Sequence, residues 1–247
     1  MQKLNLYLFV LLLPLVFDAA AQSGVYLELR AGAGTFGMKS MKELQQQAVH
    51  TSGIDAKTTD TFGPYVQFGA NVLKDLNENT RAGIFVEHGS TGGRVSYRDY
   101  SGEILIDDLM SYNAVGGMLY SHYAIRESKL HFFSGMELNA FFSKLVHKEY
   151  WRIYTESAES EDTFKAIGVG IKPFVGLQYP VVHLPLRLSV GYMASASAPF
   201  HEPGKPKNKL TRNADGKSLE PGWSGLRLNL SVAFPLFGKD GKHSGVK

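Results

Sequence analysis

Near the end of the chain lies a segment in which every second residue is large and apolar. Successive side chains of a β-strand point to opposite faces, so this pattern predicts a strand with one apolar face and one polar or small face. The apolar positions are Leu226, Leu228, Leu230, Val232 and Phe234, and the positions between them are Arg227, Asn229, Ser231 and Ala233. Seven further segments show the same alternation, at about residues 25–34, 62–73, 81–87, 109–124, 130–142, 168–179 and 186–192. The fourth contains adjacent glycines, Gly116 and Gly117, which leave its facing ambiguous.

The first residues have the features of a secretory signal peptide. Lys3 precedes an apolar run over residues 4–17, and Ala19-Ala20-Ala21 offers a cleavage site of small residues. The run is shorter than the roughly 20 residues that a membrane-spanning helix needs. We therefore predict a signal peptide over 1–21, a barrel over 22–237 and a flexible C-terminal tail over 238–247. The sequence has no cysteine, which excludes disulfides and a lipid-modified cysteine.

The connections between the predicted strands alternate in length. Four are long, at about 38–61, 90–108, 144–163 and 197–222, and three are short, at about 74–79, 126–129 and 180–185. Short turns at one rim and long loops at the other are typical of bacterial outer-membrane barrels. The fold class that we predict is an all-β, eight-stranded antiparallel up-and-down transmembrane β-barrel with short periplasmic turns and long extracellular loops. Residues 94–106 suggest a projecting hairpin, and residues 150–154 lead into an acidic tip at 156–162.

The orientation of the faces distinguishes a membrane barrel from a soluble exported barrel. A soluble barrel of the lipocalin type turns its apolar face inward and its charged face to water. Here the polar face is mostly Gly, Ser, Asn and Gln and lacks a dense charged coat, which favours apolar side chains outward. The charged residues of that face would then pair inside the barrel. This predicted lumen network comprises Glu28, Arg30, Arg81, Glu87, Glu137, Lys172, Arg187 and Arg227. Aromatic residues near the segment ends suggest interfacial girdles, namely Tyr26, Phe36, Phe62, Tyr65, Tyr123, Tyr179, Trp223 and Phe237.

Motifs for catalysis are weak. The eight histidines form no metal-ligand spacing, so we predict neither a metal nor a cofactor. His88 and Ser90 could share one strand face, as a nucleophile and its base would in a lipid-modifying enzyme, but a polar strand end beside lipid headgroups is the favoured explanation. The net charge of +3 is too small to indicate nucleic-acid binding. Because the motifs for catalysis are weak, we expect no enzymatic activity.

Charge in the long connections suggests binding. The connection between the fifth and sixth strands is acidic, with Glu156, Glu159, Glu161 and Asp162, and the last long connection is basic, with Lys205, Lys207, Lys209, Arg212 and Lys217. These groups could pair with each other, bind a protein partner or hold lipopolysaccharide phosphates, but a simply solvated face is the favoured interpretation. Residues 38–48 predict a short helix, with Met38, Met41, Leu44 and Ala48 on one face, which would cover the barrel mouth.

A family resemblance rests on the residues that follow the first strand. Gly32-Ala33-Gly34-Thr35-Phe36 followed by the Met- and Lys-rich helix over residues 38–47 resembles the outer-membrane β-barrel domain proteins of Bacteroidota, the PorT-like or "porin family" group. The resemblance covers the mature chain in architecture and residues 32–47 in motif. It implies an eight-stranded barrel in the outer membrane, with some relatives serving secretion systems, and it brings no catalytic residues. The residues after Phe237 depart from the aromatic ending that is common in other outer-membrane barrels.

The favoured function is a non-enzymatic cell-envelope barrel in the outer membrane. Its extracellular loops would bind a partner or serve a structural role at the surface, and its partners would be outer-membrane lipid or lipopolysaccharide and a protein. The alternatives are a narrow transport channel, a lipid-modifying enzyme and an accessory barrel of a secretion system.

Overall fold

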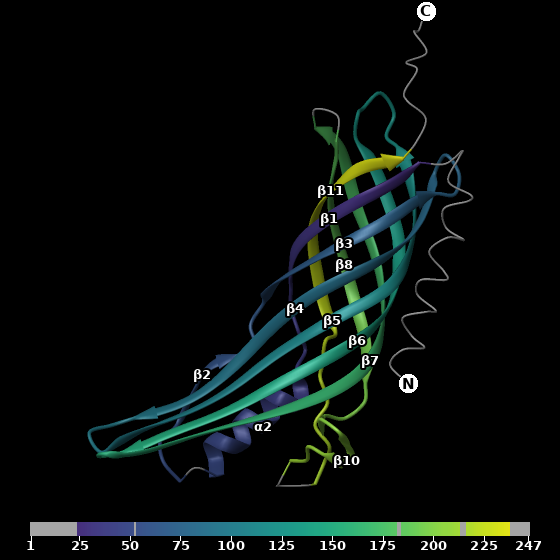
Figure 1. Ribbon diagram of the computed structural model, residues 1–247. Coiled ribbons are helices and arrows are strands. Elements are labelled where there is room, and N and C mark those ends of the chain that lie inside the picture. Colours follow the sequence, from purple (N-terminus) through teal and green to yellow (C-terminus); the bar gives the residue numbers. More distant parts are fainter. Residues whose placement is uncertain (1–23, 52, 182–183, 213–215, 238–247) are drawn as a thin grey trace, which may run out of the picture.

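The computed structural model describes residues 24–237 apart from residue 52, residues 182–183 and residues 213–215. The predicted signal peptide and the predicted C-terminal tail lie outside the described residues. In the described part, eight long strands form a ring in which every neighbouring pair is antiparallel (Figure 1). They are β1 (Val25–Gly34), β3 (Tyr65–Asp75), β4 (Thr80–Arg98), β5 (Gly102–Ala124), β6 (His131–Ile153), β7 (Glu156–Val181), β8 (Leu184–Ser197) and β11 (Gly225–Phe237).

The ring closes between the first strand and the last. Val25 of β1 lies opposite Phe237 of β11, and Gly34 lies opposite Arg227. Closure pairs the backbone groups that an open sheet would expose at its two edges. The predicted eight-stranded up-and-down barrel is thereby confirmed.

The smaller elements lie at the end of the barrel opposite to Val25 and Phe237 (Figure 1). They are the helix α2 (Lys39–Thr51) and the short strands β2 (Lys57–Thr61), β9 (His201–Glu202) and β10 (Lys205–Lys209). The predicted helix over 38–48 is confirmed in position. Across the described ranges, no helix has the length and apolar character needed to cross a membrane.

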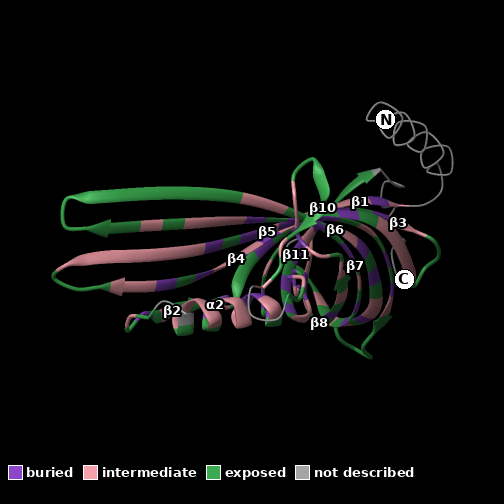
Figure 2. Cartoon of the chain, turned by 90° about the horizontal axis from the view of Figure 1, so that it is seen from below, coloured by how far each residue is buried: buried purple, intermediate pink, exposed green. Residues whose placement is uncertain are grey.

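The strands alternate between buried and exposed residues, which appears as banding along the barrel wall in Figure 2. The exposed face carries large apolar side chains on all eight strands, a surface that we call the apolar belt. It includes Leu29, Val66, Phe68, Val72, Ile84, Val86, Val115, Leu119, Met136, Leu138, Phe142, Ile167, Val169, Ile171, Val175, Leu177, Leu188, Val190, Leu226, Leu228 and Leu230. The apolar faces predicted from the alternation therefore point outward.

The facing of β5, which the sequence leaves ambiguous, is settled by Gly116. A Cβ atom at Gly116 would lie 2.1 Å from the carbonyl oxygen of Leu138 and 2.7 Å from the ring of Phe85. Only glycine fits this crowded inward position, so Tyr112 and Tyr120, an even number of residues away on the same strand, also point inward and are buried.

Strands β4 to β7 continue well beyond the apolar belt as a four-stranded projecting sheet, formed by residues 94–98, 102–107, 148–153 and 156–161 (Figure 1). The predicted hairpin over 94–106 is confirmed. Its turn is held by Asp99, whose Oδ1 accepts hydrogen bonds from the backbone nitrogen and hydroxyl of Ser101 at 2.8 and 2.7 Å. These bonds lower the pKa of the Asp99 carboxyl to about 2.

The acidic segment is a correction to the sequence prediction. Residues 156–162 are not a loop tip but the first part of β7, paired residue by residue with β6, and the turn is at Tyr154 and Thr155. The strand tolerates its acidic charge because basic side chains of β6 lie opposite it. Lys148 faces Glu161 in the register, and their side chains form an ion pair of 2.7 Å.

Candidate functional site

The middle of the barrel interior is filled by a layer of ion pairs. The guanidinium of Arg30 contacts Glu87 at 2.7 Å and Glu137 at 2.8 Å, and Lys172 contacts Glu137 at 2.8 Å. Arg187 forms an ion pair with Glu28 in the same layer. All of these side chains are buried. Asn71 and Tyr112 extend the layer by donating hydrogen bonds to Glu28 and Glu87, at 2.6 and 2.7 Å.

Two residues of the predicted lumen network lie elsewhere. Arg81 pairs with Asp75 at 2.5 Å, at the rim with the short turns, and its guanidinium lies over the ring of Tyr26. Arg227 is buried and donates to the carbonyl oxygens of Thr35 and Trp223, with the ring of Phe36 4.5 Å away. Sequence alternation places a side chain on a face but does not determine its partner, and for Arg227 that partner is backbone.

Apolar side chains close the interior on both sides of the ionic layer. Towards the short turns lies a cluster of Leu73, Phe85, Met118, Tyr120, Phe133 and Phe174. Towards the long connections lies a larger cluster, which we call the mouth plug, containing Phe36, Met38, Met41, Phe62, Tyr112, Phe141, Leu145, Phe200 and Trp223. The indole nitrogen of Trp223 donates to the hydroxyl of Ser143 at 2.7 Å, which fixes the plug to the barrel wall.

The aromatic girdle predicted from the sequence is wrong in part. Tyr123 and Tyr179 are exposed on the outer face, and Tyr65 is exposed at the start of β3. Phe36, Phe62 and Trp223 are buried in the mouth plug instead, and Tyr26 packs against the apolar cluster near the short turns. These residues lie at the ends of strands or in connections, where the chain leaves the alternation that decides facing within a strand.

In the described part of the chain, side chains leave little free space in the middle of the barrel interior. The hollow within the ionic layer, lined by Glu28, Arg30, Glu137 and Arg187 among others, has a volume of about 20 Å³. A single water needs roughly 10–15 Å³ of such space, so the layer holds at most one or two waters. An eight-stranded barrel is just wide enough for its own side chains, and this one is filled by them.

A larger cavity lies at the mouth, between the inner face of the four long strands and helix α2. This mouth cavity has a volume of about 500 Å³. It is lined by Leu44, Gln45, Gln47, Ala48, Val95, Ile106, Asp108, Leu145, His147, Glu149, Asp162, Phe164, Leu210 and Thr211. Leu44 and Ala48, from the apolar helix face predicted by the sequence, form one wall.

Sequence reasoning missed the polar group of this cavity. His147 lies between two carboxylates, with its Nδ1 2.7 Å from Asp108 and its Nε2 3.1 Å from Glu149. The hydrogen bond with Asp108 raises the pKa of His147 to about 9. The signal was present in the alternation, because residues 145, 147 and 149 continue the inward face of β6, but it lay in a segment expected to be a loop.

The candidate base His88 contacts residues other than the candidate nucleophile Ser90. His88 and Ser90 share the outer face of β4, but the His88 Nδ1 lies 2.9 Å from the amide oxygen of Asn113 and the ring of His88 packs on Phe68. In the register Ser90 lies opposite Ser111. This arrangement fits a polar strand end better than an activated serine.

The basic residues of the last long connection lie on β10 and after it. Lys205 pairs with Glu202 at 2.9 Å, and Arg212 pairs with Glu43 of α2 at 2.5 Å. Lys207 and Lys209 are exposed. The Arg212 contact ties the connection to the helix that covers the mouth.

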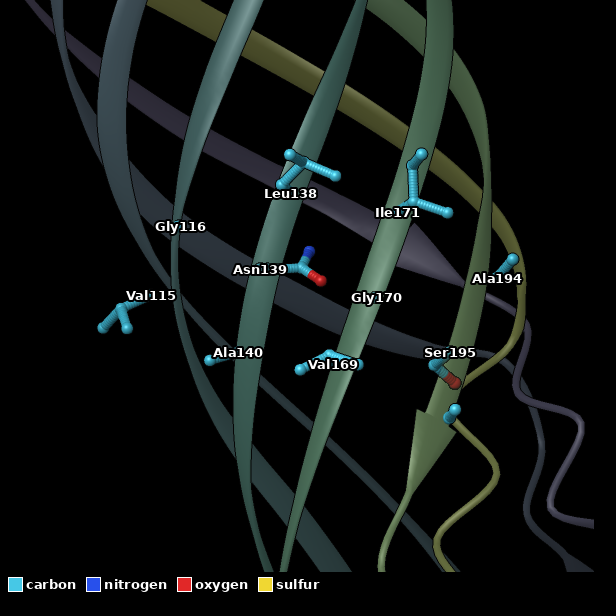
Figure 3. Close-up of a pocket in the computed structure, with 11 residues that line it drawn as sticks. Val115, Gly116, Leu138, Asn139, Ala140, Val169, Gly170, Ile171, Ala194 and Ser195 are labelled. Atoms are coloured by element: carbon cyan, nitrogen blue, oxygen red, sulfur yellow. The ribbon is translucent and has the colours of Figure 1, made fainter.

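A shallow hollow lies on the outer wall of the barrel between β5 and β8, and Figure 3 shows the residues that line it. Its volume is about 700 Å³. Ala140, Ala194 and Ala196 contribute small side chains to its lining, and Leu138 and Ile171 contribute larger apolar ones. Because it belongs to the apolar belt and offers few polar groups, it suits a hydrocarbon chain.

Comparison with known proteins finds similarity of structure only. No family model matches the chain, and no curated protein matches its sequence. Similar solved structures include Neisserial surface protein A, with 12% identity, a TM-score of 0.38, and coverage of 85% of this chain and 95% of that chain. The N-terminal β-barrel domain of Pseudomonas aeruginosa OprF has 11% identity and a TM-score of 0.29, with 87% and 100% covered. Ail, the attachment invasion locus protein of Yersinia pestis, has 12% identity and a TM-score of 0.29, with 87% and 98% covered. The assignment of this chain as a closed barrel rests on its own strand pairing.

The ionic layer predicts that Arg30→Met strongly destabilises the barrel. The change leaves Glu87 and Glu137 buried with less compensation, which costs about 3–5 kcal/mol. The midpoint of unfolding, followed by the change in gel mobility on heating, should fall accordingly. Arg94→Met is the matched control, since the Arg94 side chain is 52% exposed in its pair with Asp107, and should cost less than about 1 kcal/mol. Equal effects of the two changes would show that the layer does not support the fold.

The raised pKa of His147 predicts a stability contribution that depends on pH. Protonated His147 faces Asp108, Glu149 and Asp162 in the cavity. Its pKa is raised above the usual value, so its contribution is complete below about pH 6.5 and is lost as the pH rises through about 9. The difference in unfolding midpoint between the wild type and His147→Gln should therefore shrink across that window. An NMR titration that places the pKa of His147 near 6.5 would contradict this expectation.

Proposed function

We propose that this protein is an outer-membrane barrel that does not conduct and that presents a recognition surface outside the cell. The observation that carries the proposal is the apolar belt around a filled, charged interior. Large hydrophobic side chains are exposed on all eight ring strands; Leu228, for example, is 51% exposed and Ile84 58%. A soluble protein of this size rarely exposes so extensive an apolar surface, whereas a lipid-facing barrel requires one.

The charges at one limit of the belt support the proposed contact with lipopolysaccharide. Lys144 and Lys165 lie directly opposite each other on β6 and β7, and both are exposed. Like charges in direct opposition destabilise a sheet unless an anion lies between them. At the boundary between the belt and the projecting sheet, a lipid phosphate would supply that anion.

The two rims support one orientation in the membrane. The rim with short turns carries both Val25 and Phe237, as expected for the periplasmic side of an outer-membrane barrel. The projecting sheet, α2 and the last connection would then face outward. The filled interior opposes the transport-channel alternative, and the contacts of His88 give no support to a lipid-modifying enzyme. A role in a secretion system and the likeness to the Bacteroidota barrel family stay predictions.

The recognition surface that we propose is the free edge of β7. The pairing partners of β7 on the side away from β6 begin at Lys165, opposite His201, so residues 156–164 have none among the described residues. At the other margin of the sheet, β2 covers residues 93–96 of β4. An edge with unpaired backbone groups adds a further strand readily. Glu156 and Glu159 on this edge favour a partner with basic side chains, and acidic charge also opposes pairing with a second copy.

The membrane proposal predicts that Leu228→Arg is costly. A basic side chain at mid-belt in lipid costs about 2–4 kcal/mol, whereas in water it would be nearly neutral. Ile153→Arg is the matched control, because Ile153 is 52% exposed near the tip of the projecting sheet. Folding titrations in lipid vesicles should show a large loss for the first change and little for the second. A wild-type chain that stays folded and dissolved without detergent would overturn the proposal.

The recognition proposal predicts binding of an extended basic peptide at the β7 edge. A peptide of alternating Lys and Thr should bind the detergent-solubilised barrel, and one of alternating Glu and Thr should not. Glu156→Lys combined with Glu159→Lys should weaken binding at least about tenfold in fluorescence anisotropy.

The control is Glu78→Lys combined with Glu127→Lys, the same charge change on exposed residues of the opposite rim. Equal weakening by both double variants would mean that net charge alone binds the peptide, and the edge would be rejected as the site.

A further inference from the structure

The mouth cavity has features of a ligand site that neither the fold nor the proposed recognition edge requires. Helix α2 lies against the long strands on the side of the projecting sheet (Figure 1), and the cavity opens between them. Its volume of about 500 Å³ falls in the range of small-molecule sites, roughly 300–1,000 Å³. The cavity is therefore large enough for an organic molecule and too small for a folded segment.

The charges that line the cavity do not balance. Asp108, Glu149 and Asp162 contribute three carboxylates, and His147 contributes the one cationic group among its lining side chains. Asp108 is buried at 2% exposure, so water does not fully solvate its charge. Both nitrogens of His147 are engaged, with Asp108 and with Glu149. The cavity is thus rich in acceptors and carries excess negative charge.

A buried acceptor without a partner gives independent evidence for a missing donor. Gln45 lines the cavity at 2% exposure, and its Nε2 donates to the carbonyl oxygen of Asp60 at 3.1 Å. This bond orients the amide, and Oε1 is left buried with no hydrogen-bond partner among the described residues. A buried acceptor left in this way destabilises the fold unless a ligand or water donates to it.

The remaining wall is apolar. Leu44 of α2, Ile106 of β5, Leu145 of β6 and Phe164 of β7 surround the polar groups, and Leu210 closes one side. A bare cation would leave this wall uncovered. In the described part of the chain, no cluster of three or more acidic or histidine side chains is arranged to hold a metal ion. The wall and the acceptors together fit a molecule with a cationic head and an apolar body.

We propose that the mouth cavity binds a small organic amine, with its ammonium group donating to Asp108, Asp162 and the Oε1 of Gln45, and its hydrocarbon part against Leu145 and Phe164. The proposal goes beyond the recognition surface described above, because the cavity would bind the amine in detergent whichever way the barrel faces in a membrane. It assigns a role to the acceptor of Gln45, which no described residue of the chain satisfies.

Calorimetric titration of the detergent-solubilised barrel with 2-phenylethylamine tests this site. We expect saturable binding, at least about tenfold tighter than that of 2-phenylethanol, which has the same body without the charge. Asp162→Asn should weaken amine binding several-fold and leave the fold intact, since Asp162 is exposed to solvent at the cavity edge. Asp108→Asn should weaken it further.

Asp107→Asn is the matched control, because Asp107 is the neighbour of Asp108 on the opposite face of β5 and pairs with Arg94. It should bind the amine as the wild type does. Equal binding of the amine and the alcohol, unchanged binding in Asp162→Asn, or no saturation up to about 10 mM amine would each overturn the proposal.

Discussion

The interior ion pairs centred on Arg30 are the interaction on which the rest of the barrel depends. A guanidinium and two carboxylates buried together are tolerable only when each charge meets its counterpart at hydrogen-bond distance, as Arg30 does with Glu87 and Glu137. Four ring strands, β1, β4, β6 and β7, contribute to this group through Arg30, Glu87, Glu137 and Lys172. The charges therefore specify which strands face one another across the lumen.

The outer face and the inner face place opposite demands on one backbone. Each strand must supply apolar side chains to the belt and polar, small or aromatic ones to a narrow lumen, and the alternation of a strand satisfies both demands at once. In the projecting sheet, beyond the apolar belt, the demand for apolar side chains on the outer face disappears. The projecting sheet has water on its outer side, so its outward residues include Arg94, Asp107, Lys148 and Glu161 in cross-strand pairs. Its inward side chains line the acceptor-rich mouth cavity beside α2.

Much of this fold could be predicted from the sequence because facing within a strand is a local property. The alternation from Leu226 to Phe234 located the last strand, and the same reasoning placed Glu28, Arg30, Glu87, Glu137, Lys172 and Arg187 inside. Where a strand ends is not local. Residues 156–162 resemble a loop in composition, and only pairing with Lys148 and its neighbours on β6 makes them a strand. Phe36 and Trp223 lie in the mouth plug for a similar reason, since their positions depend on contacts across the barrel. The mouth cavity was missed because Gln45, Asp108 and His147 come from three elements far apart in the sequence.

Closure of the ring by β1 and β11 also constrains the order in which the barrel is made. Strands β3 to β8 are joined in sequence, so their pairing brings together residues close along the chain. The guanidinium of Arg227, by contrast, meets the carbonyl oxygen of Thr35 across 192 positions. Contacts of such long sequence separation form late and slowly, because the loop they close is costly in chain entropy. A nascent chain that lacks β11 therefore has two strand edges with unpaired backbone groups. Another chain can pair with these edges until β11 does, so correct assembly of the barrel depends on how soon β11 becomes available.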